Sequence, residues 1–164
     1  MIIVVNVTIN TKKRTMAQNK QLKLEQFLPF RLVNAADTLS LMFAERYRKK
    51  YGLTRPEWRS FAILGENNNI TATDVGAISG MHKTKVSRAV ASLAARGWVS
   101  RRRNTSDRRI ENLVLTCRGK TQYKKMALEA QTFEQDIESR LGPKGVKIVW
   151  QAIDYLDALD ADRL

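Results

Sequence analysis

The stretch "RRRNTSDRRI" at residues 101–110 places five arginines and a single aspartate in ten positions. Like charges repel one another, so a folded chain gathers them only where some other group offsets the cost. Phosphate oxygens are a partner that guanidinium groups bind well. The stretch therefore points to binding of a polyanion.

The excess positive charge lies in the middle of the chain. The formal net charge is +13 over 164 residues. Residues 81–125 hold thirteen Lys and Arg against two acids, Asp107 and Glu111, whereas residues 126–164 hold four against eight. Such a basic segment indicates nucleic acid or an anionic membrane face as partner. The acidic C-terminal part cannot share that role.

Several protein classes are disfavoured by composition. One cysteine, Cys117, excludes an internal disulfide and fits a reducing, cytoplasmic compartment. No apolar run approaches the roughly 18 residues of a membrane helix, so we expect no membrane association. One histidine, His82, and the lack of a glycine-rich phosphate loop or nucleophile elbow argue against an enzyme. We expect no cofactor and no metal site.

Helical spacing of apolar residues predicts the elements that precede the basic stretch. Thr54 with Glu57, and Thr71 with Asp74, have the spacing of capping boxes that begin helices. Four helices are predicted, over residues 27–51, 54–66, 72–79 and 83–96. The third and fourth are joined by about three residues that include Gly80, which is typical of a helix-turn-helix.

The period changes after the fourth helix. "WVSRRR" and "IENLVL" alternate as strands do, and the turn formers "NTSD" lie between them, so a β-hairpin is predicted with the basic stretch at its tip. Thr116 ends the second strand and caps a long helix, which Gly142 and Pro143 separate from a last one. A helix-turn-helix followed by a hairpin is a winged helix.

The predicted fold class is mainly α with a small β-hairpin wing. We expect a winged helix-turn-helix DNA-binding lobe, and N- and C-terminal helices that form a dimerisation lobe. The apolar stripes of the end helices are longer than one chain can obviously cover, which favours a dimer. The alternative is a monomer that packs its own end helices together. The expected parts are a flexible arm over 1–20, a dimerisation helix over 21–52, the winged helix over 53–116 and dimerisation helices over 117–164.

The fourth helix has one face suited to the major groove of DNA. Val86, Ala89, Val90 and Leu93 take the core side. An α-helix fits the major groove, where base edges present a readable pattern of donors and acceptors. An ordinary solvated face is the alternative. The side chains left to meet bases and phosphates are Lys83, Thr84, Lys85, Ser87 and Arg88.

The wing resembles that of MarR-type (multiple antibiotic resistance regulator) transcriptional regulators. That family's wing has D-x-R followed by an apolar strand ending L-T-x-x-G, and the helix order also fits over residues 27–160. The resemblance implies a homodimer on a pseudo-palindromic operator in double-stranded DNA, acting as a repressor that a ligand releases. The matching residues are Asp107, Arg109, Leu115, Thr116 and Gly119.

The resemblance also implies roles for the wing residues. Arg109 is expected to enter the minor groove, where negative potential favours arginine. Asp107 is expected to brace the tip by pairing with Arg103 or Arg109, and a plain turn former is the alternative. Arg101, Arg103 and Arg108 complete the expected DNA contacts of the wing. Because strand residues alternate, Arg102 lies on the opposite face from Arg101 and Arg103.

Further candidates carry two interpretations each. The resemblance also implies a pocket for a small aromatic or phenolic effector between the dimer helices and the winged lobe. Its expected lining is Phe43, Tyr47, Trp58 and Phe61, although aromatic residues at helical spacing also build cores. Cys117 is either an oxidant sensor or a bystander, and His82 either a phosphate contact or an exposed helix terminus.

The alternative function is that of an architectural protein that binds DNA without sequence preference. Such a protein is held on DNA by charge alone. Thr84, Ser87 and Arg88 on the groove face argue for the regulator, because phosphate contacts alone carry no sequence information.

Overall fold

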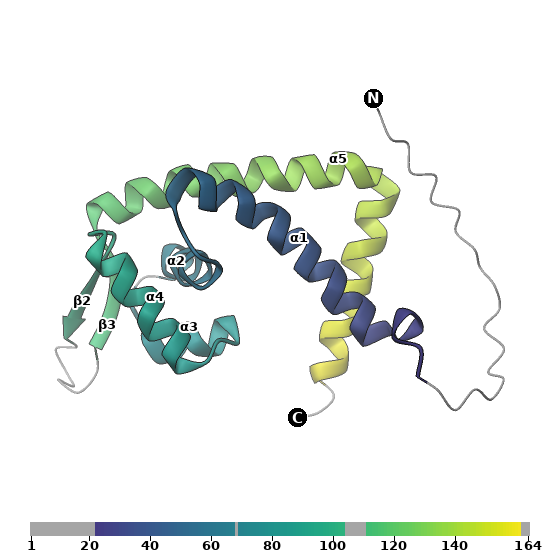
Figure 1. The fold of residues 1–164 in the computed structure, drawn as a ribbon, viewed down its shortest axis with the longest axis horizontal. Helices are drawn as coiled ribbons and strands as arrows, with labels where there is room; N and C mark the ends of the chain where they lie inside the picture. The colour runs from purple at the N-terminus through teal and green to yellow at the C-terminus, as the bar shows by residue number, and fades with distance from the viewer. Residues whose placement is uncertain (1–21, 68, 104–110, 162–164) are drawn as a thin grey trace. The chain divides into compact units, whose positions relative to one another are not determined.

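The computed structural model describes residues 22–67, 69–103 and 111–161 of the chain. The predicted arm over residues 1–20 lies outside them. In chain order the elements are η1 (Leu24–Gln26), α1 (Leu28–Tyr51), α2 (Arg55–Glu66), β1 (Ile70–Thr71), α3 (Ala72–Ser79), α4 (Lys83–Ala95), β2 (Val99–Arg103), β3 (Glu111–Leu115) and α5 (Cys117–Ala161) (Figure 1).

The predicted fold class is confirmed. The chain is mainly helical, and its strands form one antiparallel sheet in the order β1-β3-β2. The hairpin β2–β3 pairs Val99 with Leu115 and Arg103 with Glu111. The strand β1 was not predicted, because its two residues, Ile70 and Thr71, are too few to show an alternating pattern. It pairs with β3 and widens the base of the wing.

Two compact units divide the chain within α1, over residues 1–38 and 39–164. In the first, the Arg31 side chain donates to the Glu25 carbonyl (3.2 Å) and the Thr38 hydroxyl to the Asn34 carbonyl (2.9 Å). The second unit holds the end of α1 and every later element, and the candidate sites below lie in it. The expected division into arm, dimerisation helices and DNA-binding lobe stays a prediction, because it depends on assembly.

The core of the second unit joins the helix-turn-helix to the sheet and to α5. The predicted inward face of α4 is confirmed, since its four apolar side chains are at most 3 % exposed. Val86, Val90 and Leu93 pack in one cluster with residues of α2, β3 and α5, among them Phe61, Leu64, Leu113 and Met126. Burial of this face leaves the opposite face of α4 in solvent.

The predicted break in the C-terminal helical region is a kink inside one element. α5 runs from Cys117 to Ala161, and Gly142 within it has φ 67° and ψ 166°, which is not helical. Pro143 follows and cannot donate the backbone hydrogen bond that would continue the first arm. Figure 1 shows α5 bending at this point, so that it consists of two arms.

Candidate nucleic-acid interface

Thr116 fixes the place where the wing ends and α5 begins. Its backbone N–H donates to the Trp98 carbonyl (3.0 Å), and its hydroxyl donates to the Gly97 carbonyl (2.7 Å). The same hydroxyl oxygen accepts the Gly119 N–H (2.9 Å), as an N-cap does. The predicted capping role of Thr116 is confirmed. One side chain therefore ties the base of the hairpin to the first turn of α5.

Gly119 allows that turn to lie against the backbone before β2. A Cβ atom placed on it would lie 2.0 Å from the Trp98 carbonyl oxygen, a distance that real Cβ atoms do not reach. The spacing of three residues between Thr116 and Gly119 thus has a structural cause, since Thr116 caps the turn in which Gly119 meets the Trp98 backbone. The L-T-x-x-G pattern is, in this chain, the joint that holds the wing against α5.

The turn between α3 and α4 is built from small and polar residues. The Ser79 hydroxyl donates to the Val75 carbonyl (2.5 Å) and accepts the Met81 N–H (3.2 Å). Gly80 has φ 64°, a left-handed conformation that glycine adopts at little cost. His82 is exposed and caps α4, since its Nδ1 accepts the Thr84 N–H (3.3 Å). This turn sets the direction in which α4 leaves α3.

Glu57 links the start of α2 to α4. Its Oε2 accepts the Thr54 N–H (2.6 Å) and the Thr54 hydroxyl (2.7 Å). Burial alone would raise the pKa of Glu57, but hydrogen bonds from Ser92 of α4 and from Thr54, with the charge of Arg96, hold it below its usual range. The predicted capping box is therefore present and also serves as a contact between two helices.

Arg96 is a basic residue of the central segment that binds the chain's own backbone. Its guanidinium donates to the carbonyls of Tyr51 (2.9 Å) and Gly52 (2.8 Å) and lies 5.5 Å from the centroid of the Trp98 ring. It thus caps the C-terminal end of α1. Sequence reasoning missed this role, because an arginine that caps a distant helix has no local pattern.

All five predicted side chains of α4 are exposed. α4 packs against α3 and β2, and Figure 1 shows these elements beside one another, with the hairpin next to the helix pair. The outward face carries three cations and two hydroxyls, which can meet phosphates and base edges. These side chains are Lys83, Thr84, Lys85, Ser87 and Arg88.

The described part of the wing contains an ion pair that the sequence did not suggest. Arg101 Nη1 lies 2.6 Å from Glu111 Oε2, and both side chains are nearly half exposed. Arg103 stands directly opposite Glu111, and Arg102 opposite Asn112 on the other face, so the predicted alternation is confirmed. The tip residues Asp107, Arg108 and Arg109 lie outside the described residues. Within the described strands, Arg101 thus pairs with an acid, Glu111.

A mainly apolar cavity of about 510 Å³ lies among α1, α2 and the two arms of α5. Of the predicted effector residues, Phe43 and Trp58 line it, with ring centroids 4.9 Å apart. Tyr47 and Phe61 are instead buried in the core, and Tyr47 stacks on Trp58 at 5.5 Å. The rest of the lining comes mostly from α5 and includes Phe133, Glu134, Ile137, Glu138, Val149, Trp150 and Ile153.

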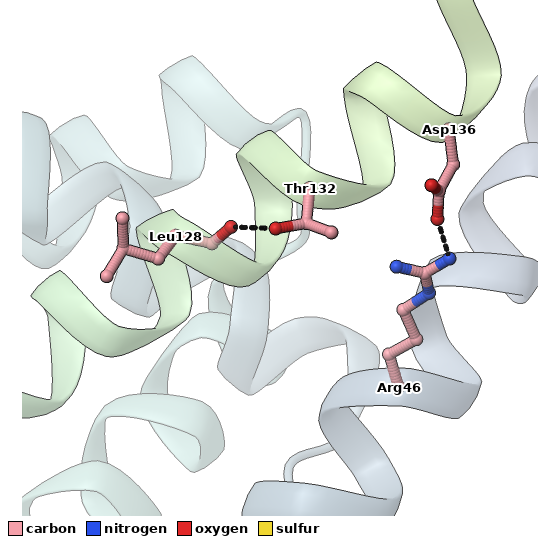
Figure 2. Close-up of polar contacts among 4 residues, drawn as sticks. All are labelled: Arg46, Leu128, Thr132 and Asp136. Carbon is pink, nitrogen blue, oxygen red and sulfur yellow. Dashed lines mark hydrogen bonds and ion pairs between the residues drawn. The ribbon is translucent and has the colours of Figure 1, made fainter. Parts of the chain in front are cut away.

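Two ion pairs connect α1 to the first arm of α5. Figure 2 shows Arg46 paired with Asp136. Arg46 Nη2 and Asp136 Oδ2 are 2.5 Å apart, and the guanidinium lies 5.1 Å from the centroid of the Phe133 ring. Lys50 pairs with Glu129. These contacts join the C-terminal half of α1 to the first arm of α5.

Two remaining features concern redox and membrane chemistry. Cys117 is an exposed, unpaired thiol at the first residue of α5. Over residues 22–67, 69–103 and 111–161, no helix is long and apolar enough to cross a membrane, and no group of three or more His, Cys, Asp or Glu could hold a metal ion.

A helix-turn-helix whose second helix exposes cations beside a basic hairpin defines the class of winged-helix DNA-binding proteins. Residues 51–110 match the model of the MarR family. No curated protein matches the chain. The MarR family transcriptional regulator of Silicibacter pomeroyi DSS-3 is 27 % identical, with a TM-score of 0.69 over 85 % of this chain and 99 % of its own.

Two further solved structures share the fold at lower identity. A MarR/EmrR family regulator from Acinetobacter sp. ADP1 is 20 % identical, with a TM-score of 0.74 over 87 % of this chain and all of its own. Streptococcus pneumoniae FabT, solved in complex with DNA, is 15 % identical, with a TM-score of 0.69 over 84 % of this chain and 97 % of its own.

The resemblance drawn from the wing is confirmed by these matches. Residues 51–110 form a DNA-binding winged helix of MarR type, and the chain shares its fold with a MarR family transcriptional regulator over 85 % of its length. The family and the structural neighbours are transcriptional regulators and not enzymes, as the sequence indicated.

Proposed function

We propose that the protein is a sequence-specific repressor that binds a pseudo-palindromic operator as a homodimer in the cytoplasm. The observation that carries this proposal is the exposed face of α4. Thr84, Ser87 and Arg88 are exposed on α4, and the neighbouring strand β2 carries the arginines at 101–103. Hydroxyl and guanidinium groups at this position serve base edges as well as phosphates.

The wing adds a second set of contacts to the proposed complex. Arg109 enters the minor groove, Arg103 and Arg108 meet the backbone, and Asp107 holds the tip in shape. Arg101 is shared between phosphate and Glu111, with which it forms its ion pair. These roles follow from the family resemblance and from the basic charge of the strand that leads to the tip.

The second arm of α5 supports the proposed dimer. One of its faces, which includes Val149 and Ile153, lines the cavity of its own chain. At 100° per residue, Ile148, Tyr155 and Leu159 lie on a roughly opposite face, and they are 52 %, 76 % and 63 % exposed. A helix that is apolar on two faces needs a second cover, and a two-fold partner supplies it with the same stripe.

The aromatic cavity supports the proposed effector. Its volume of about 510 Å³ lies within the range of small-molecule sites, and Phe43 and Trp58 offer flat apolar surfaces. Because its walls come from α2 and both arms of α5, a ligand there would bias the position of the winged helix against the dimer helices. The carboxylates of Glu134 and Glu138 at its edge favour a neutral or cationic aromatic molecule.

A duplex titration tests the proposal against the architectural alternative. Wild-type protein and Arg88→Ala are titrated with a selected operator and with random duplex at two salt concentrations. We expect the wild type to prefer the operator, and Arg88→Ala to lose about 1–3 kcal/mol mainly on the operator. Equal wild-type affinity for both duplexes would contradict a regulator, because phosphate contacts carry no sequence information.

A further inference from the structure

A second basic surface lies beside the face of α4. It shares Lys85 with the residues already expected to meet DNA, and it adds arginines of α2 that sequence reasoning did not assign to DNA. It is a hollow of about 320 Å³ between the start of α2 and the start of α4. Pro56, Gly80 and Met81 form its apolar and backbone walls. Its remaining lining residues, which we call the basic cradle, are Arg55, Arg59, His82 and Lys85.

The composition of the basic cradle indicates an anion. Two arginines, a lysine and a histidine line it, and among the described residues of the lining there is no acid. The adjoining hollow includes the carboxylate of Glu57, whose Oε2 already accepts two hydrogen bonds from Thr54. Because His82 accepts a hydrogen bond at Nδ1, its neutral form carries the proton on Nε2 and keeps that atom as a donor.

The position of the basic cradle indicates which anion. Lys85 and Pro56 also line the adjoining hollow, whose other residues include Arg88 on the groove face of α4. The cradle therefore borders the surface that faces the major groove. Arg59, His82 and Lys85 are exposed, and such an open site suits one group of an extended polymer better than a small ligand, which pockets largely enclose.

We propose that the basic cradle binds a backbone phosphate of the DNA strand that flanks the groove occupied by α4. Arg59 of α2 and Lys85 of α4 hold the phosphate from two sides and so fix the depth of α4 in the groove. The inference rests on the proposed function for the placement of α4, and it adds α2 to the DNA-binding surface. A phosphate contact of this kind positions the protein and carries no sequence information.

The test compares Arg59→Ala with wild type in titrations against operator and random duplex over a range of salt concentrations. We expect weaker binding to both duplexes by a similar factor, an unchanged preference between them, and a slope of log K against log salt that is smaller by about one per winged helix. Arg59→Lys keeps the charge and should restore the slope. Arg140→Ala, an equal loss of charge on α5, is the matched control and should leave the slope unchanged.

Three results would overturn the cradle as a backbone site. One is a slope that Arg59→Ala leaves unchanged. A second is a loss confined to the operator, which would make Arg59 a base contact. The third is a melting temperature that inorganic phosphate raises in wild type and not in Arg59→Ala, while DNA binding is unaffected, which would assign the cradle to a free anion. If wild type fails to prefer the operator but Arg59→Ala still lowers the slope, the proposed function fails and the cradle stands.

Discussion

Arg101 and Glu111 pair across the wing hairpin, with Nη1 and Oε2 2.6 Å apart. The two residues are diagonal neighbours across the strands, because the residue directly opposite Glu111 is Arg103. In the described strands of this basic hairpin, the Glu111 carboxylate thus lies on the same face as Arg101 and Arg103. That carboxylate neutralises part of the charge that the wing would otherwise offer to phosphate.

Glu111→Gln is therefore expected to strengthen DNA binding. The variant removes a negative charge near the phosphates and frees Arg101, so affinity for operator and random duplex should both rise about two- to fivefold, equivalent to less than 1 kcal/mol. Because the pair is exposed, the melting temperature should change little. Duplex titration measures the affinity, with Glu45→Gln on α1 as control. Weaker binding would show that Glu111 orients Arg101 for DNA.

Gly119→Ala should destabilise the joint between the wing and α5. Its Cβ would lie 2.0 Å from the Trp98 carbonyl oxygen, and backbone cannot move away as a flexible side chain can. We expect a loss of about 1–3 kcal/mol or more in the free energy of unfolding. Thermal melting measures it, with Lys120→Ala on the next, exposed residue as control. Equal melting temperatures for Gly119→Ala and wild type would refute the close approach.

Glu57 should make stability depend on pH in acid. Its pKa is lowered in the folded protein by hydrogen bonds from Ser92 and Thr54, which outweigh the effect of burial. Stabilisation by a depressed carboxyl is present above its unfolded pKa, about 4.3 for Glu, and is lost as pH falls through the lower folded value. Glu57→Gln should lower stability at pH 7 by about 0.5–2 kcal/mol and flatten the acid limb.

Chemical denaturation between pH 3 and pH 7 measures this effect. Glu66→Gln, at the exposed end of the same helix, is the control and should keep the wild-type profile. An acid limb that is as steep in Glu57→Gln as in wild type would show that other carboxyls account for it.

The exposed stripe on the second arm of α5 should control assembly. Ile148→Glu combined with Tyr155→Glu places charge on that stripe, so the pair of substitutions should convert a dimer to a monomer of 18.7 kDa in sedimentation equilibrium. Lys147→Glu, at an exposed polar position of the same arm, should remain dimeric. A wild-type protein that sediments as a monomer at micromolar concentration would contradict the proposed dimer.

The cavity should prefer aromatic cations to aromatic anions of the same shape. Naphthylmethylammonium and naphthoate differ mainly in charge, and Glu134 and Glu138 lie at the cavity edge. We expect the cation to bind about two- to tenfold more tightly, and Glu134→Gln with Glu138→Gln to remove the difference. Quenching of Trp58 fluorescence reports binding, and Trp58→Phe identifies the signal. Tighter binding of naphthoate would place another charge in control of the site.

The sequence predicted the helices and the hairpin because their signals are local. The capping pairs at Thr54 and Thr71, the period of α4 and the turn at Gly80 each lie within one or two turns of chain. The strand β1 was missed because a two-residue strand exists only through its pairing with β3. Prediction therefore succeeded for the elements that are determined by their own local sequence.

Long-range contacts decided which charged residues face outward, and the sequence could not reveal them. Arg96 belongs to the same basic segment as Arg88, yet its guanidinium caps α1 over a separation of 44 residues. Glu111 became visible as a partner of Arg101 only once the hairpin register was known. Tertiary packing likewise separated the four predicted effector residues. Tyr47 and Phe61 are buried in the core, whereas Phe43 and Trp58 line the cavity.

Selection of bound duplexes from a random DNA pool tests the central claim, sequence-specific binding by a dimer, most directly. The account predicts an enriched inverted repeat with half-sites about one helical turn apart, roughly 10 base pairs from centre to centre, and loss of the enrichment in Arg88→Ala. A pool that shows no enriched motif, although the protein binds it tightly at low salt, would contradict the account and leave a protein held on DNA by charge alone.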